Sequence, residues 1–217
     1  MTTEKMNVHR ALSELKVLDD RIDDAINRTH LCVAAKHSAT KLDGMSLSDY
    51  KENIKSNYQK TMDLIRRRDA LKRAVVNSNA ETTVTVAGET MTVAEAIDKK
   101  NHGVCYLKTV LRRMSVDYEN AMRTINQHSG DYLEKAAEQY VLSIIASLPK
   151  DSKLGVDDEL MKANRKNYIE NNTYDLIDPI NIVKVMDDLR ETISTFESEV
   201  DAVLSTSNAV TEIEISY

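Results

Sequence analysis

Apolar residues recur at alternating steps of three and four along most of this chain, which places them on one face of an α-helix. Residues 3–36 and 47–76 follow this pattern and predict two long helices, joined by a short link that contains Gly44. A third helix begins near residue 93 and carries the most regular pattern of the chain, a seam typical of coiled-coil packing. Its apolar positions are Val104, Leu107, Leu111, Met114, Tyr118, Ala121 and Ile125.

Three more helices are expected in the second half of the chain. Residues 131–148 form the first, which ends before Pro149 because the residue preceding a proline disfavours helical geometry. A link at 150–155 leads to a shorter helix at 157–169. Asp178 and Pro179 predict the start of the last long helix, with a second regular seam, and we expect it to end near residue 205.

The apolar pattern changes to a period of two at two places, which indicates β-strands. Residues 82–86 predict a strand that turns at Ala87 and Gly88 and returns over 89–91 as a small hairpin. Thr92 and Glu95 then have the spacing of a capping box, which starts the third helix. The final residues, 210–217, alternate again and predict a terminal strand.

A short internal repeat connects the two strands, because the letters SNA precede both of them, at 78–80 and at 207–209. Since a lone terminal strand needs a partner, we expect the two strands to pair, in the same chain or between neighbouring chains. The residues expected to form this pairing are Thr82, Val84 and Val86 with Thr211, Ile213 and Ile215.

These elements predict a mainly α fold, an elongated bundle of long amphipathic helices with coiled-coil-like seams and a small β element at one end. At 217 residues the chain is long enough to bury a core, and we expect a single domain over 1–217. Its expected parts are a helical hairpin at 3–78, a β-hairpin at 79–92, helices at 93–148, C-terminal helices at 156–206 and a terminal strand at 208–217.

Composition supports long elements and excludes several functions. Five Gly and two Pro leave few helix breakers, and the aromatic share is only 5%, with one Phe and no Trp. A net charge of −6 argues against a general binder of long nucleic acid or of membranes. The chain has two cysteines, no signal-like start and no apolar run of about 20 residues, which favours a reducing cytoplasm.

Three short motifs resemble a known group of proteins. They are RAVVNSNAETTVTVAGETMTVAEAID at 73–98, INRTH at 26–30 and SNAVTEIEI at 207–215. Together they are similar to uncharacterised proteins encoded by tailed bacteriophages and, more distantly, to the septicolysin-like family of small helical bacterial proteins, in which Asn stands where this chain has His30. The resemblance implies a phage origin and an oligomeric helical fold, in the host bacterial cytoplasm or in the virion, and supplies no catalytic residues.

No constellation in the sequence predicts catalysis, a cofactor or a metal. Histidines and cysteines, which are soft metal ligands, occur in two sets whose spacing does not match a zinc module. Four aspartates of the first helix are interpreted as a hydrated face. No nucleophile has a recognisable base, and no glycine-rich phosphate loop is present. The residues concerned are His30, Cys32 and His37, then His102 and Cys105, and the aspartates Asp19, Asp20, Asp23 and Asp24.

Two basic clusters leave two hypotheses for function. The first is a non-enzymatic phage structural or assembly module that acts as a homo-oligomer and contacts itself and another phage or host protein. The alternative is a phage anti-defence protein that binds and sequesters a small anionic nucleotide signal in pockets between protomers, because arginine forks suit phosphate. The candidate ligand residues are Arg66, Arg67, Arg68, Lys72 and Arg73 on the second helix and Lys108, Arg112 and Arg113 on the third.

Overall fold

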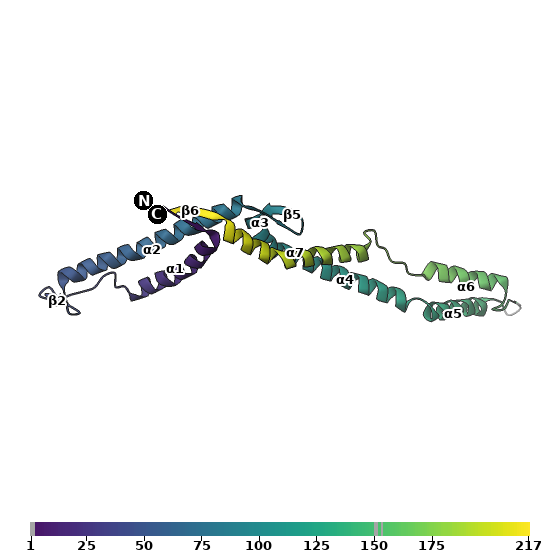
Figure 1. The fold of residues 1–217 in the computed structure, drawn as a ribbon. Helices are drawn as coiled ribbons and strands as arrows, with labels where there is room; N and C mark the ends of the chain where they lie inside the picture. The colour runs from purple at the N-terminus through teal and green to yellow at the C-terminus, as the bar shows by residue number, and fades with distance from the viewer. Residues whose placement is uncertain (1–2, 150–151, 153) are drawn as a thin grey trace. The chain divides into compact units, whose positions relative to one another are not determined.

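The computed structural model describes residues 3–149, 152 and 154–217 and confirms a mainly α fold with small antiparallel sheets (Figure 1). The chain divides into two compact units. Unit 1 is Met1–Val104 together with Ser194–Tyr217, and unit 2 is Cys105–Ile193. In the link predicted at 150–155, residues 150, 151 and 153 lie outside the described part of the chain.

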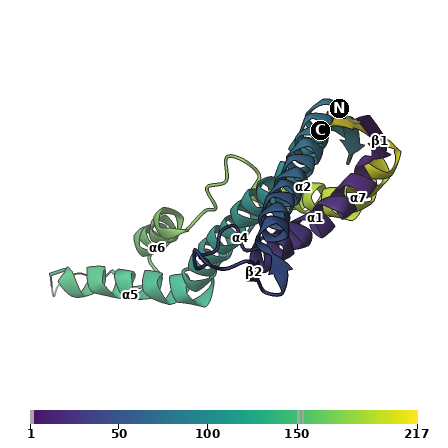
Figure 2. The same cartoon turned by 90° about the vertical axis from the view of Figure 1, so that its left-hand side faces the viewer.

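Unit 1 begins with a helix pair, in which α1 (Val8–Arg28) and α2 (Leu47–Glu81) lie side by side (Figures 1 and 2). The connection contains a two-residue ladder, β2 (Lys41–Leu42) with β3 (Met45–Ser46), and Gly44 takes a positive φ of 84° in its turn. Helix α2 continues five residues beyond its predicted end at 76.

The helix predicted over 3–36 is wrong at both ends. Residues 3–7 form strand β1 (Thr3–Asn7), and α1 ends at Arg28. The Asn7 side chain accepts a hydrogen bond from the Arg10 N–H at 2.9 Å, which caps the helix one residue before Val8. The strand residues bond instead to a segment more than 200 residues away, a partner that local periodicity does not report.

The predicted hairpin is confirmed as β4 (Thr83–Val86) paired with β5 (Glu89–Thr92), with Ala87 and Gly88 at positive φ in the turn. The predicted capping box is confirmed as well. The Thr92 hydroxyl accepts from the Glu95 N–H at 3.2 Å, and the Glu95 carboxylate accepts from the Thr92 N–H at 2.7 Å. Helix α3 (Val93–Asp98) follows, then a π-helical turn, η1 (Lys99–Gly103), which leads into α4 (Val104–Gln127).

The terminal strand is confirmed as β6 (Glu212–Ser216), but its predicted partner within the chain is wrong. Strand β6 pairs antiparallel with β1, with Ile213 opposite Met6 and Ile215 opposite Glu4 (Figure 1). Strand β4 is already paired with β5, because a two-residue turn closes a hairpin at little entropic cost. Strand β6 forms its backbone hydrogen bonds with β1, a segment for which the sequence predicts a helix.

The two strand pairs are nevertheless built alike. We call them the β1–β6 junction and the β4–β5 junction. In each, a threonine ends a long helix: the Thr82 N–H donates to Ser78 at 2.8 Å, and the Thr211 N–H donates to Ser207 at 2.9 Å. The carbonyl of the same threonine accepts, at 2.9 Å, from the first residue of the next helix, Val93 for Thr82 and Val8 for Thr211.

The cores of the junctions correspond position by position. The sequence MNVHRA at 6–11 matches MTVAEA at 91–96, and in both the Met, Val and Ala side chains are buried. The β1–β6 junction packs on α2 through Leu71 and Val75. The equivalent buried pairs are Met6 with Met91, Val8 with Val93, Ala11 with Ala96, Ile213 with Val84, Ile215 with Val86 and Leu71 with Val200.

Unit 2 contains most of α4, then α5 (Asp131–Ser147) and α6 (Glu159–Asn172), which lie side by side (Figure 1). The last helix, α7 (Ile182–Val210), begins in unit 2 and ends in unit 1. It starts three residues later than Pro179, because the Asp178 carboxylate accepts from the Ile182 N–H at 2.8 Å, and it runs past the predicted end at 205.

Candidate interaction surfaces

Arg67, one of the predicted anion ligands, is instead held by the chain itself. Its Nε donates to Glu14, a terminal nitrogen donates to Glu4 at 2.9 Å, and the other donates to the Tyr217 hydroxyl. The hydrogen bond to Glu14 raises the pKa of Arg67 above its ordinary value, burial lowers it by less, and Glu4 and Tyr217 add to the rise. This guanidinium therefore ties α1, β1 and the end of β6 to α2.

Several other predicted basic residues are also paired with carboxylates. Arg66 contacts Asp63 at 3.1 Å, Arg113 contacts Asp117 at 2.9 Å, and Arg68 contacts Asp19 at 2.7 Å. The hydrogen bond with Asp19 raises the pKa of Arg68. Lys72, Arg73 and Arg112 are exposed, and Lys108 is exposed with a partner of its own. The first cluster lies in unit 1 and the second in unit 2.

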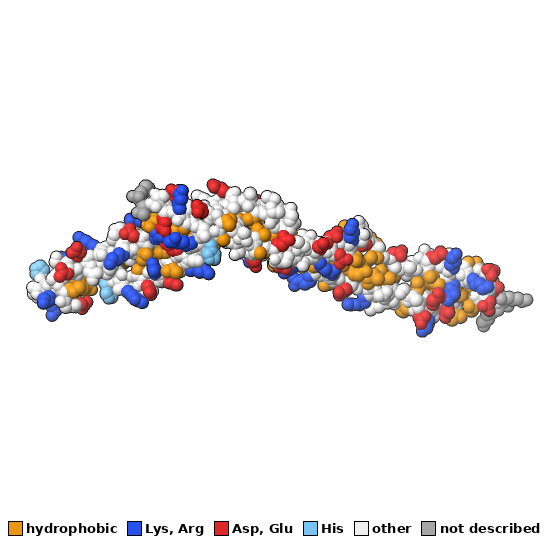
Figure 3. Space-filling model, viewed as in Figure 1, with side chains coloured by type: hydrophobic (Ala, Val, Ile, Leu, Met, Phe, Trp, Pro, Cys, Tyr) orange, Lys and Arg blue, Asp and Glu red, His pale blue; other side chains and the backbone are white. Residues whose placement is uncertain are grey.

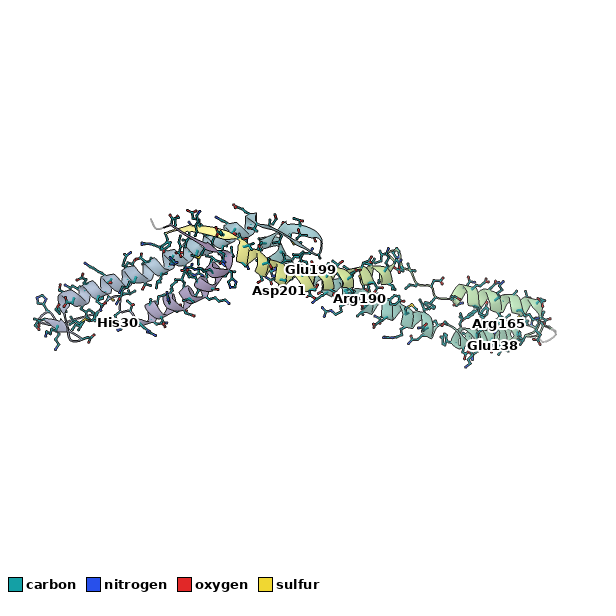
Figure 4. All side chains as sticks on the ribbon, viewed as in Figure 1. His30, Glu138, Arg165, Arg190, Glu199 and Asp201 are labelled. Atoms are coloured by element: carbon teal, nitrogen blue, oxygen red, sulfur yellow. The ribbon has the colours of Figure 1, made fainter. Side chains whose placement is uncertain are left out.

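The soft-ligand sets are not arranged as a metal centre. Within the residues that the structure describes, no three His, Cys, Asp or Glu side chains are placed to hold an ion. Both cysteines are exposed, and the His102 Nδ1 lies 2.9 Å from the Asp98 carboxylate. His30, beyond the end of α1, lines a cavity of about 220 Å³ with Tyr50 and Asp43 (Figure 4).

The seam predicted on α4 forms but is only half covered. Val104 is its single buried position, and all six others, from Leu107 to Ile125, remain half-buried. The beginning of α7 lies against this helix, where the Ser115 hydroxyl is 3.4 Å from the Met186 sulfur. A helix covered by one neighbour retains apolar surface on both flanks of its seam, whereas bundles close that surface with further helices.

A second apolar surface belongs to the α5–α6 pair. The Tyr140 and Tyr168 rings stack with centroids 4.8 Å apart, and Arg165 reaches Glu134 and, at 3.6 Å, Glu138 (Figure 4). These contacts join the helices, yet large apolar side chains of the pair and of the segment after α6 stay exposed. They include Tyr132, Leu142, Leu160, Leu176 and Ile177, of which Ile177 is 91% exposed.

A third surface is a groove in unit 1 beside the β4–β5 junction, which we call the α7 groove. It has a volume of about 430 Å³ and is lined by the C-terminal turns of α7 and by the start of β4. Apolar side chains reach the surface over this part of α7 (Figure 3). The lining residues are Thr82, Thr83, Val84, Ala202, Val203, Thr206, Ser207, Val210 and Thr211, none of which is charged.

The α7 groove brings together the two segments that the SNA repeat connected, although they do not pair as strands. Sequence reasoning missed the α7 residues of this groove because it ended the helix at 205. A signal was present, since residues 202–211 form an uncharged run of ten in a chain of which 29% is charged.

Fold and surfaces together define a mainly α protein with three partly uncovered apolar surfaces. A search against models of protein families, against curated proteins and against solved structures finds no match. Within the described residues, no helix has both the length and the apolar character needed to cross a membrane.

Proposed function

We propose that this protein is a non-enzymatic interaction module of a tailed bacteriophage, which acts as a homo-oligomer in a structural or assembly role. The sequence motifs that resemble phage proteins support the origin. The half-covered seam of α4 and the exposed apolar side chains of the α5–α6 pair support the mode of action, because a further layer of helices would cover them. In this role the protein would work in the host cytoplasm or as part of the virion.

The exposed area of the chain is the observation that carries the proposal. The protein exposes 15427 Å². Two compact units of the same sizes would together expose only about 12,000 Å². An obligate homodimer interface buries about 2,000 to 5,000 Å² in total, which is about 1,000 to 2,500 Å² from each chain. The difference of about 3,000 Å² per chain is therefore large enough to supply such an interface.

Capture of a nucleotide signal has weaker support. Four of the eight candidate ligands, Arg66, Arg67, Arg68 and Arg113, are engaged by carboxylates of the same chain. An anion would have to displace these partners, which costs part of the binding energy it gains. Exposed Lys72, Arg73 and Arg112 would have to supply the site across protomers.

Light scattering coupled to size exclusion tests the proposal, with the protein loaded between about 1 and 100 μM. We expect a mass at least twice 24.5 kDa. Purified virions and an affinity pull-down of the tagged protein from infected cells then distinguish a virion component from an assembly factor. A monomer at every concentration, together with absence from virions and from phage complexes, would refute the proposal. A thermal-shift screen against cyclic and linear nucleotides tests the alternative.

A further inference from the structure

We infer that the α7 groove is a two-fold self-association surface, in which the end of α7 from one copy sits in the groove of a second copy. This inference rests on the proposed homo-oligomeric function and specifies one interface for it. The apolar side chain that would enter the second copy and the groove that would receive such a side chain lie next to each other in the same chain. Val210 is 72% exposed at the rim of the groove, and Ala202 and Thr206 are exposed on the same face of α7.

The end of α2 can be compared with the end of α7, because the β1–β6 junction and the β4–β5 junction correspond position by position. Residues 73–82 at the end of α2 stand where residues 202–211 stand at the end of α7. Arg73 corresponds to Ala202, Asn77 to Thr206 and Glu81 to Val210. All three counterparts on α2 are exposed polar or charged side chains. The fold therefore tolerates a charged surface at this place, and the apolar character of the α7 groove is not required for the junction to form.

The absence of charge in the lining favours a second copy over a different partner. Near the axis of a two-fold interface, each residue faces its own copy, so that any charge is opposed by an identical charge. The nearest carboxylates along α7 are directed to partners in the same chain (Figure 4). Glu199 accepts from the Ala87 N–H at 2.7 Å, and Asp201 contacts Lys100. The exposed residues Glu81 and Glu212 adjoin Thr82 and Thr211 but are not part of the lining. The uncharged lining itself therefore meets the requirement for self-association.

The substitution Val210→Glu tests this interface without endangering the fold, because glutamate already occupies the corresponding position, Glu81. In a two-fold dimer it places two carboxylates opposite each other, and we expect the dissociation constant to rise at least about ten-fold. The matched control is Glu81→Gln, an equally large change of charge, one unit, at the equivalent position on α2. We expect this control to keep the wild-type dissociation constant. Sedimentation equilibrium measures both, and circular dichroism checks the fold.

A charge swap separates self-association from other uses of the groove. Val210→Lys alone should also weaken association, and an equimolar mixture of Val210→Glu and Val210→Lys should restore a mixed dimer, because opposite charges then face each other. Wild-type association that neither substitution changes would overturn this interface and leave homo-oligomerisation standing. A monomeric wild type would overturn both. Loss of binding to another phage protein with unchanged self-association would assign the groove to that partner and refute our inference.

Discussion

Replacing Arg67 with methionine should measurably destabilise unit 1. The side chains of Arg67, Glu4 and Glu14 are 21%, 29% and 22% exposed. Removing the guanidinium leaves two half-buried carboxylates without their shared cation, while methionine keeps much of the apolar stem. Exposed ion pairs contribute about 0 to 1 kcal/mol and broken buried pairs cost about 3 to 5 kcal/mol. This intermediate case should cost about 2 kcal/mol of unfolding free energy.

Urea unfolding followed by circular dichroism measures this loss as a lower midpoint at unchanged slope. A loss of about 2 kcal/mol corresponds to a fall in Tm of roughly 4 to 8 °C for a chain of this size. Arg66→Met is the control, because the Arg66 side chain is 63% exposed and contacts Asp63, an exposed residue of the same helix. That change should cost less than about 0.5 kcal/mol.

The cause is tested by adding Glu4→Gln and Glu14→Gln to the Arg67→Met variant. Glu4 keeps its contact with Arg10 at 3.5 Å, whereas both carboxylates lose Arg67. If the lost compensation of their charges causes the loss, removing these charges should recover part of the stability. The reasoning is refuted if Arg67→Met and Arg66→Met have equal effects, or if Arg67→Met costs less than about 0.5 kcal/mol. Failure of the double glutamine change to recover stability would assign the loss to packing.

Three further results are expected. The first is a circularly permuted chain that is opened between residues 87 and 88 and in which a short glycine linker joins Tyr217 to Thr3. It should fold with an unchanged circular dichroism spectrum, since β6 and β1 would become a hairpin like β4–β5. An unfolded product would contradict the equivalence of the junctions. The Glu95 carboxyl should titrate below the ordinary range of a glutamate in a carbon-detected NMR titration, because the hydrogen bond from the Thr92 N–H lowers its pKa. This cap therefore stabilises α3 above the ordinary pKa of a glutamate, and the stabilisation is lost as the pH falls through the lowered pKa. Leu71→Ala should cost about 2 to 5 kcal/mol in urea unfolding, because the side chain is fully buried, and a cost below 1 kcal/mol would place it outside the core.

Much of the fold was readable from local patterns. The helices, the β4–β5 hairpin and the box of Thr92 and Glu95 depend on residues within a few positions of one another, and all are predicted near their observed places except for the two ends of α1. The errors occurred where a distant segment decides the local structure. Residues 3–7 contain one apolar residue, Met6, and no local strand pattern, yet they form a strand because β6 supplies their hydrogen bonds.

The second half of the internal repeat illustrates the same limit. The SNA match is visible in the sequence, whereas MNVHRA and MTVAEA share only Met, Val and Ala, and the apolar period of the first segment predicts a helix. Only the cross-strand contacts identify β1 and β5 as equivalent strands that each lead into a capped helix.

The candidate surfaces likewise combine features that the sequence predicts with features that only the folded structure shows. The sequence alone determined where arginines cluster and where apolar seams run, since both follow from the spacing of residues along one helix. Tertiary structure alone decided that Arg67 is engaged by Glu4, Glu14 and Tyr217, and that the end of α7 and the start of β4 enclose a groove. Partners separated by 53 to 150 residues in the chain leave no local pattern, because what joins them is proximity in the folded protein.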